Sequence, residues 1–325
     1  GARCLTLEKS EMKKTLVAVA ALAVAGGAFA QSTVNLTGKL AFAYESAKAQ
    51  TSGAKTSGLR VTDGDFVLTA VEDLGGGLKA QASMAVQSRG RTTAVAGRDA
   101  TVALMGGFGR VTIGAVESGN GIIGLAGAGA PVIGLDNGVT SAAAGNVDWL
   151  AYHTPNMGGF TGTIQLVDSI GAAGTGGAES TSGLQDAVLV GAAYANGPLS
   201  ASADYTSYGQ NAVAAAAATD NRFRISGMYD LGVAKLGLGY AKQSTVAGVD
   251  TKDTFIGVSA PFGPVTVGLN YATRKVDGAA TAKGLDLGVE YALSKRTNIR
   301  AMYQTIDVGT AIDGSTARIR LMHSF

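Results

Sequence analysis

The chain has 325 residues, of which 48 are glycine, five are proline and only 15% are charged. Typical soluble domains carry about 25% charged residues, and disordered chains are usually rich in charge. Apart from one short N-terminal stretch there is no long apolar run, which excludes a bundle of membrane-spanning helices of about 20 residues each. The formal net charge of +2 gives no support to a nucleic-acid partner.

The first predicted element is an export signal. Two lysines precede the apolar run Leu16–Ala25, and an A-x-A pattern ends at Ala30. This is the anatomy of a Sec-type signal peptide. The only cysteine, Cys4, precedes that pattern, so no thiol is left for a disulfide or a metal site in the rest of the chain. We expect an upstream extension over 1–11, a signal peptide over 12–30 cleaved near Ala30/Gln31, and the folded domain over 31–325.

From Gln31 onward, apolar and polar residues alternate with a period of two, which predicts β-strands. In the segment 265–271, for example, Val, Leu and Tyr alternate with Thr, Gly and Asn. A soluble β-sandwich shows the same alternation with its apolar face turned inward, so the alternation does not identify the fold by itself. The same pattern recurs over 34–42, 222–229, 285–291 and 318–325.

The connections distinguish the two folds, because tight turns alternate with long loops. Short turns at one end and long loops at the other are typical of bacterial outer-membrane barrels. Tyrosines recur at strand ends, as in an aromatic girdle at the membrane interface. Tight turns are predicted at Asp73–Gly77, Gly106–Gly107, Pro155–Gly159, Asn196–Gly197, Asp230–Val233, Pro261–Pro264 and Ser294–Lys295, and long loops at Tyr44–Arg60, Val116–Asn146, Asp168–Gln185 and Ser207–Asp220.

The fold class is therefore all-β: a transmembrane antiparallel β-barrel of about 16 strands, each spanning with about 9–11 residues. Lipid does not tolerate an open sheet edge, so the sheet must close, and a barrel of about 16–18 strands leaves an aqueous channel. The connection 116–146 is long, rich in glycine and poor in charge. A loop of that length is usually functional, and we expect it to fold inward and narrow the pore as a constriction loop.

Motifs for covalent chemistry find no support. Gly119–Gly124 matches G-x-G-x-x-G, but a good helix does not follow and Asp136 comes too early for a dinucleotide site, so we interpret the segment as a loop. His153 and His323 are the only histidines, and turn or interfacial packing explains them better than a metal site or a catalytic pair. We therefore expect no catalytic residue, no metal and no cofactor.

Several segments resemble the Gram-negative porins of β-proteobacteria, and the resemblance extends from Gln31 to Phe325. It implies a homotrimer of 16-stranded barrels in the outer membrane that passes small hydrophilic solutes and ions by passive diffusion. It also implies a third loop inside each pore, at Val116–Asn146, and a C-terminal Phe325 that the barrel assembly machinery reads. The matching segments are VEDLGGGLKA (71–80), FGRVTIG (108–114), YHTPNMGGFTG (152–162), GAAYANGPLSASADY (191–205), PFGPVTVG (261–268), YALSKRTNIRAMY (291–303) and IRLMHSF (319–325).

The chain departs from the family where arginines usually line the lumen. Asp65 and Thr69 replace two arginines of the second strand, and Ala115 replaces one after the fifth strand. The anion preference that is frequent in the family therefore does not carry over, and the sign of the selectivity stays open.

A pore selects by its diameter and by the charges that line it. Strand parity predicts lumen positions for a set of charged wall residues, while the inserted loop offers Glu117 and Asp136. Our hypothesis is that basic wall residues face these loop acids across the constriction. The alternative is that the charges lie in wide regions, where salt screens them over about 8 Å. The predicted wall residues are Lys39, Asp65, Arg222, Arg224, Arg300, Arg318 and Arg320.

Three other functions compete with a general diffusion channel. A solute-specific outer-membrane channel fits the same sequence. A barrel enzyme would need a cluster with histidine at the loop end, where neither histidine falls. A secreted, adhesive β-solenoid would need a fixed short repeat, which the sequence lacks. The expected surroundings are outer-membrane lipid and lipopolysaccharide.

Overall fold

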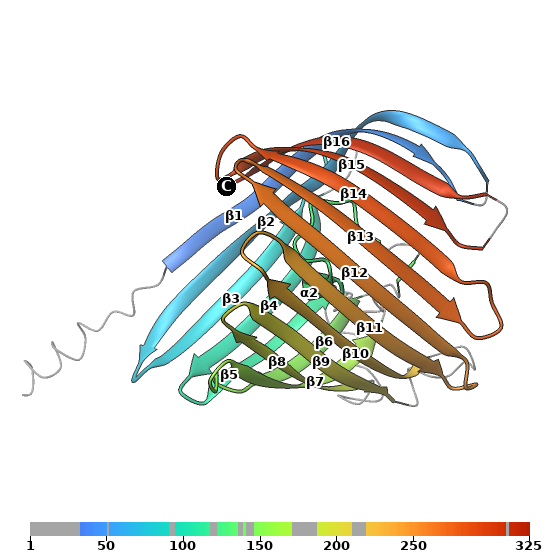
Figure 1. The fold of residues 1–325 in the computed structure, drawn as a ribbon. Coiled ribbons are helices and arrows are strands. Elements are labelled where there is room, and N and C mark those ends of the chain that lie inside the picture. Colours follow the sequence, from blue (N-terminus) through green and yellow to red (C-terminus); the bar gives the residue numbers. More distant parts are fainter. Residues whose placement is uncertain are drawn as a thin grey trace, which may run out of the picture.

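The computed structural model describes residues 33–50, 52–90, 95–117, 122–135, 139–140, 146–170, 187–209, 219–309 and 312–325. Its strands form one closed barrel in which each strand pairs antiparallel with its chain neighbours and β1 pairs with β16 (Figure 1). The predicted all-β barrel of about 16 strands is confirmed. No helix among the described residues is long and apolar enough to cross a membrane.

The strands are β1 (Thr33–Lys48), β2 (Lys55–Gly75), β3 (Leu78–Gln87), β4 (Ala96–Gly106), β5 (Gly109–Glu117), β6 (Asn146–His153), β7 (Phe160–Ile170), β8 (Ala187–Asn196), β9 (Leu199–Tyr208), β10 (Thr219–Asp230), β11 (Lys235–Thr245), β12 (Asp250–Phe262), β13 (Val265–Val276), β14 (Ala282–Ala292), β15 (Thr297–Asp307) and β16 (Gly314–Ser324). The short helix α2 (Ile123–Ala126) follows β5.

The two ends of the barrel differ, as the sequence predicts. Each tight turn predicted above connects two strands of the barrel, for example β12 to β13 around Gly263, which has a φ of +61°. A positive φ is inexpensive only for glycine, which explains the glycines at these turns. We call this the turn end; the opposite end, which carries the longer connections, is the loop end.

One predicted long loop is wrong. The segment Tyr44–Arg60 is mostly strand, because β1 continues to Lys48 and pairs with β2 from Lys55 onward. The resulting hairpin has strands of 16 and 21 residues, longer than the bilayer requires. Alternation is weak there because both faces of the projecting part carry polar residues.

The outer face of the barrel carries large apolar side chains that are strongly exposed. Ile225 is 47% exposed, Leu238 63% and Val289 46%. A water-soluble protein rarely exposes a continuous apolar surface of this kind, whereas a lipid-facing wall requires it. Exposed tyrosines, including Tyr240, Tyr271 and Tyr303, lie on the same face, as a membrane girdle requires.

The connection after β5 returns into the barrel. Figure 1 shows α2 within the barrel, behind β11 and β12. Its residues pack on the inner side of these strands, so the described part of this loop lies against the wall and inside the lumen.

Candidate functional site: the lumen and its inserted loop

The inserted loop lies on a floor of glycines. A Cβ atom added to Gly268 would come within 2.6 Å of the Cβ atom of Ala130, and one added to Gly284 within 2.7 Å of the Cδ2 atom of Leu135. Real Cβ atoms do not approach other atoms so closely, so the loop needs glycine at these positions. We call this set the loop seat; it consists of Gly237 and Gly239 on β11, Gly257 on β12, Gly268 on β13, and Gly284 and Gly288 on β14.

The loop backbone is closest to the wall at two of these glycines. A Cβ atom on Gly257 would collide with the carbonyl oxygen of Ala126, and one on Gly288 with that of Pro131. Only a strand position without a side chain lets a second backbone approach to this distance. The seat therefore accepts the loop backbone directly on the strand backbone.

Polar side chains of the wall bind the loop backbone beside the seat. Asp286 is fully buried, and its Oδ2 accepts hydrogen bonds from the N–H of Gly134 (2.6 Å) and from Nε2 of Gln304 (3.1 Å). Gln304 also donates to the carbonyl oxygen of Gly134. On β12, the Ser259 hydroxyl donates to the carbonyl oxygen of Ala128 (2.6 Å). These bonds satisfy loop peptide groups that would otherwise be buried without partners.

A small apolar core completes this attachment. Four loop residues are almost completely buried against inward-facing side chains, the largest of which is Phe255 on β12, with no exposed surface. The core removes apolar area from the water of the lumen and so stabilises the inserted position of the loop. The loop contributes Ile122, Ala126, Leu135 and Val139, and the wall contributes Ala241, Phe255, Ala272 and Ile306.

The loop seat also identifies the inner face of every strand, because residues paired across a sheet lie on one face. Gln304 touches the loop and shares its face of β15 with Arg300 and Met302. Met302 pairs with Arg318, and Arg318 pairs with Glu45 of β1. The arginines of β15 and β16 therefore point into the lumen.

A second part of the inner wall consists of ion pairs between neighbouring strands. Glu45 binds Arg60 (2.7 Å) and Arg318 (2.7 Å to Nε). Asp63 binds Lys39 (2.7 Å) and Arg320 (3.2 Å). We call this region, together with the Arg300–Glu290 pair, the charged wall; it extends over β14, β15, β16, β1 and β2.

The remaining predicted wall cations lie further round the barrel. Arg224 on β10 binds both carboxylate oxygens of Asp204 on β9 (2.9 and 3.0 Å). Arg222 lies over the ring of Tyr208, with its Cζ 6.0 Å from the ring centre. The predicted lumen acid Asp65 accepts a hydrogen bond from Nε2 of Gln87 (2.8 Å). All of these residues occupy positions on the inner face.

The structure corrects the prediction for Glu117. It is the final residue of β5 rather than part of the loop, and it forms an ion pair with Arg98 of the neighbouring strand β4. The second predicted acid, Asp136, lies outside the described residues. Among the described residues, the wall cations Lys39, Arg300, Arg318 and Arg320 bind wall carboxylates and not Glu117.

Sequence reasoning missed the acidic partners Glu45, Asp63 and Glu290 and the role of the seat glycines. Glu45 fell in a segment predicted to be a loop, and its alternation with Ala43 and Ala41 was the signal that could have placed it. The alternation places the seat glycines of β13 and β14 on the polar face of their strands. It does not show whether such a glycine lies under a loop or faces water, because the sequence alternates in the same way in both cases.

Phe325 closes the barrel at the turn end. Its N–H donates to the carbonyl oxygen of Gly38, and its carbonyl oxygen accepts the N–H of Gly38, both at 3.0 Å. Its ring covers Gly38, where a Cβ atom would lie 2.6 Å from Cζ of the ring. The last residue is thus part of the seam between β1 and β16.

The described residues offer little for covalent chemistry. They contain no group of three or more His, Asp and Glu side chains arranged to hold a metal. Nδ1 of His153 forms a hydrogen bond with the Thr163 hydroxyl, and Nδ1 of His323 one with that of Thr297, both at 2.9 Å. α2, at the G-x-G-x-x-G segment, has only four residues.

An apolar outer wall, a closed sheet of 16 strands and a charged lumen with an inserted loop define a water-filled outer-membrane channel. Residues 16–311 match the Gram-negative porin family, and the chain belongs to it. It is an outer-membrane porin for passive diffusion of small hydrophilic solutes.

Individual relatives agree with this assignment. The chain is 34% identical to outer membrane porin protein 32 of Delftia acidovorans, over 94% of this chain and 92% of the relative. It resembles the solved anion-selective porin from Comamonas acidovorans with 25% identity and a TM-score of 0.70, over 91% of this chain and all of that one. OmpT of Vibrio cholerae, solved in a trimer form, shares the fold at 16% identity, with a TM-score of 0.64 over 90% and 99% of the two chains.

Proposed function

We propose that the constriction of this pore lies between the inserted loop on its seat and the charged wall beside it, which begins on the same strand β14. The observation that supports this most is the loop backbone packed directly on Gly257 and Gly288 inside the barrel. A loop fixed there reduces the cross-section and leaves the charged wall as the remaining polar surface for a solute. The pore-lining residues in this proposal are Lys39, Asp65, Arg222, Arg224, Arg300, Arg318 and Arg320, with Asp136 from the loop.

The proposed selectivity is a weak preference for anions. The Comamonas relative is described as anion-selective. Here the five cations of the charged wall face three carboxylates that bind them directly, and Asp65 lies beside them on the same face. Paired charges give a smaller field than unpaired ones, so the excess of positive charge along the wall is small.

The experiment is a planar-bilayer recording of residues 31–325 folded in detergent, with a salt gradient across the membrane. We expect stepwise increases in conductance as single proteins insert. We also expect a reversal potential shifted slightly toward the equilibrium potential of the anion. Correctly folded barrels without conductance would contradict an open pore and favour a plugged or solute-specific one. A strong cation preference would contradict the proposed selectivity.

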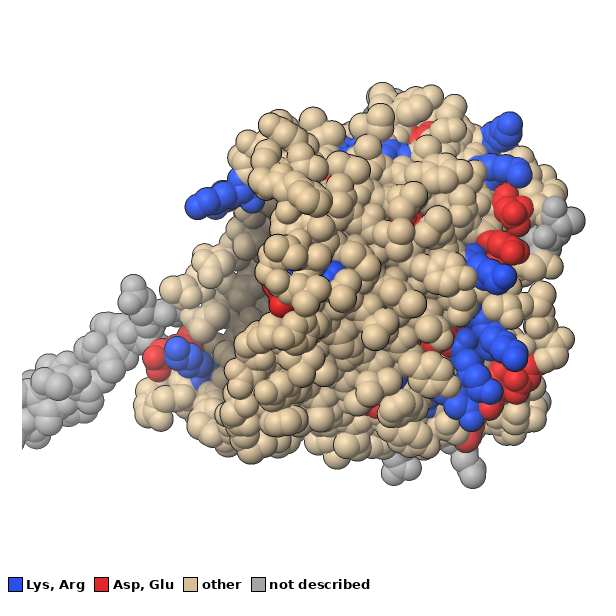
Figure 2. All heavy atoms as spheres, viewed as in Figure 1, with Lys and Arg blue, Asp and Glu red and all other residues tan. Residues whose placement is uncertain are grey.

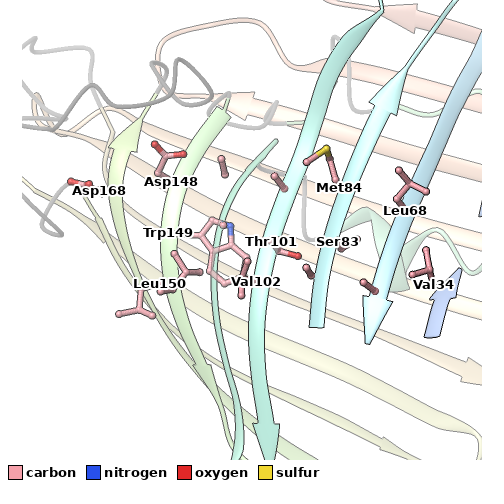
Figure 3. A pocket seen from close by; sticks show the side chains of 16 residues that line it. Val34, Leu68, Ser83, Met84, Thr101, Val102, Asp148, Trp149, Leu150 and Asp168 are labelled. Atoms are coloured by element: carbon pink, nitrogen blue, oxygen red, sulfur yellow. The ribbon is translucent and has the colours of Figure 1, made fainter. Parts of the chain in front are cut away.

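We also propose that three copies associate through the outer wall around β2–β5. Small side chains on successive strands leave an apolar hollow of about 900 Å³ there (Figure 3). An apolar hollow of this size can receive apolar side chains of a second barrel, which allows the two walls to approach closely. Conductance steps in groups of three, together with a trimer mass by light scattering, are expected; a single step and a monomer mass would contradict the trimer. The small side chains include Ala70, Ala82, Ala100 and Ala115.

For export, we propose that residues 12–30 are removed near Ala30/Gln31. β1 begins at Thr33, immediately after this point, which supports a mature chain that starts with the barrel. The intact mass of the protein recovered from outer membranes tests the cleavage site. Phe325, by its place in the closing seam, is proposed as the residue read by the barrel assembly machinery. The chain acts as a channel and not as an enzyme in this proposal, surrounded by outer-membrane lipid and lipopolysaccharide.

A further inference from the structure

Three lysines form a row on the outer wall near the loop end. Gly237, Gly239 and Ala241 of β11 face the loop inside the barrel, so Lys242 faces outward. Lys242 pairs directly with Lys252 on β12, and Lys252 pairs with Lys275 on β13. We call these three residues the lysine row.

The lysine row lowers the stability of the barrel when no anion is bound. Side chains directly opposite in antiparallel strands lie about 5 Å apart, and like charges in that position repel each other. The side chains of Lys242 and Lys252 are each 42% exposed, so water screens part of this repulsion. A row of like charges kept on three neighbouring strands favours the binding of an anion.

The chain itself supplies only part of the counter-charge. Asp250 binds Lys242 at 2.8 Å and reaches Lys252 at 3.9 Å. Asp277 lies at the same end, and its carboxylate accepts the N–H of Asp250 at 3.3 Å. Among the described residues, Lys275 has no ion-pair partner. The row therefore keeps an excess of positive charge.

The row lies close to two exposed tyrosines of the outer wall. Tyr240 lies two residues from Lys242 on the same outward face, and Tyr271 lies four residues from Lys275. Such tyrosines mark the membrane interface, and the apolar wall continues below them toward the turn end. Figure 2 shows the lysines, arginines and acids in view gathered along the loop end, with few on the wall between the two ends.

We propose that the lysine row binds the phosphate-bearing headgroup of a lipid in the outer leaflet, with the acyl chains along β11–β13. The inference rests on the proposed function as an outer-membrane channel, because the longer loops of such barrels face the cell exterior. Phosphate oxygens accept hydrogen bonds from several ammonium groups at once, and long lysine stems can extend along the apolar wall while their charge reaches the headgroup. Lipid bound there would lie on the wall behind the loop seat.

The test measures binding of diphosphoryl lipid A to the folded porin in detergent, by native mass spectrometry with titration of the lipid. The triple variant K242Q/K252Q/K275Q removes the charges and keeps the side-chain length. Each lysine near an anionic lipid surface contributes about fivefold, so the variant should bind about 100-fold more weakly. The matched control is K79Q/K295Q/R296Q, which removes three cations at the turn end and should bind as the wild type does.

Three outcomes would overturn the assignment. The triple variant could bind the lipid as strongly as the wild type. The wild type could bind a fully dephosphorylated lipid A equally well, which would assign the affinity to the acyl chains. Inorganic phosphate could displace the lipid at equal concentration, which would indicate a site for the free ion. Single-channel conductance of the triple variant should stay unchanged, so failure of the lipid site is distinguishable from failure of the pore.

Discussion

The loop seat and the charged wall lie on the same inner face, yet they are built from opposite kinds of residue. On β14 the two regions are only two residues apart, with Gly288 under the loop and Glu290 in an ion pair with Arg300. At the first position a backbone lies opposite, and any side chain would collide with it. At the second position the side chain is partly exposed, and its charge is stabilised by its partner on the next strand. The amino-acid type at an inward position is therefore decided by what lies opposite that position. The alternation along the strand does not decide it.

The largest effect is expected from a side chain in the loop seat. In the variant Gly288→Val the new side chain takes the space of the Pro131 carbonyl, so the loop should leave the wall and single-channel conductance should rise. Overpacking of this kind also costs about 1–3 kcal/mol of folding free energy. The control is Gly227→Val on the outer face of β10, where the nearest atom, the Ser200 carbonyl oxygen, is 3.5 Å from an added Cβ. Equal conductance in both variants would show that the seat does not hold the loop.

A smaller effect is expected when the loop keeps its seat but loses its polar attachment. Asp286→Ala removes the acceptor for the N–H of Gly134 and for Gln304. Hydrogen bonds to a charged group contribute about 1.5–3 kcal/mol, so the open-channel current should become noisier and the midpoint of denaturation should fall. Asp65→Ala removes an inward carboxylate that binds Gln87 and not the described loop residues, so its current should stay quiet. Noise in both variants would argue against a specific attachment.

Substitutions in the charged wall should change the ion selectivity of the pore and leave its size unchanged. Glu45→Gln leaves Arg60 and Arg318 without their shared carboxylate, so the reversal potential should move toward the anion. One charge at about 5 Å in water is worth about 0.8 kcal/mol, so the permeability ratio should change by at most about fourfold. Glu72→Gln removes an exposed carboxylate on the outer face and serves as the control. A shift toward the cation would contradict the inward position of these arginines.

The smallest effect is expected at the exposed edge of the charged wall. The side chain of Arg60 is 52% exposed and that of Arg318 is 15% exposed, although both bind Glu45. Exposed ion pairs contribute about 0–1 kcal/mol. Arg60→Gln should therefore lower the free energy of unfolding less than Arg318→Gln, as measured by heat-modified gel mobility across a urea series. The reverse order would mean that burial does not rank these pairs.

Much of this fold follows from the sequence because a strand shows its two faces at every second residue. The tight turns, the number of strands and the inward parity of residues such as Arg318 and Arg320 could be predicted in this way. The register between strands could not, since alternation is unchanged when one strand slides by two residues along another. That register decides that Glu45 meets Arg318 and that Asp63 meets Lys39.

The projecting hairpin of β1 and β2 shows a second limit. Beyond the lipid the outer face no longer needs apolar side chains, so the period of two disappears although the strands continue. The same reasoning explains the seat glycines, because a missing side chain carries no information about what occupies its space. To predict either feature, one must know where a distant segment of the chain or the lipid lies. The alternation along one strand carries no information about that.

The seam between β1 and β16 has a consequence for how the protein is made. Lys39–Lys48 pairs with Ser315–Ser324, so the first and last strands of the barrel bind each other. Until translation and export have delivered the final residues, both sheet edges remain unpaired, and an unpaired edge invites pairing with other chains. The sheet therefore cannot close before the C-terminal strand is available, and the chain must be shielded from aggregation until then.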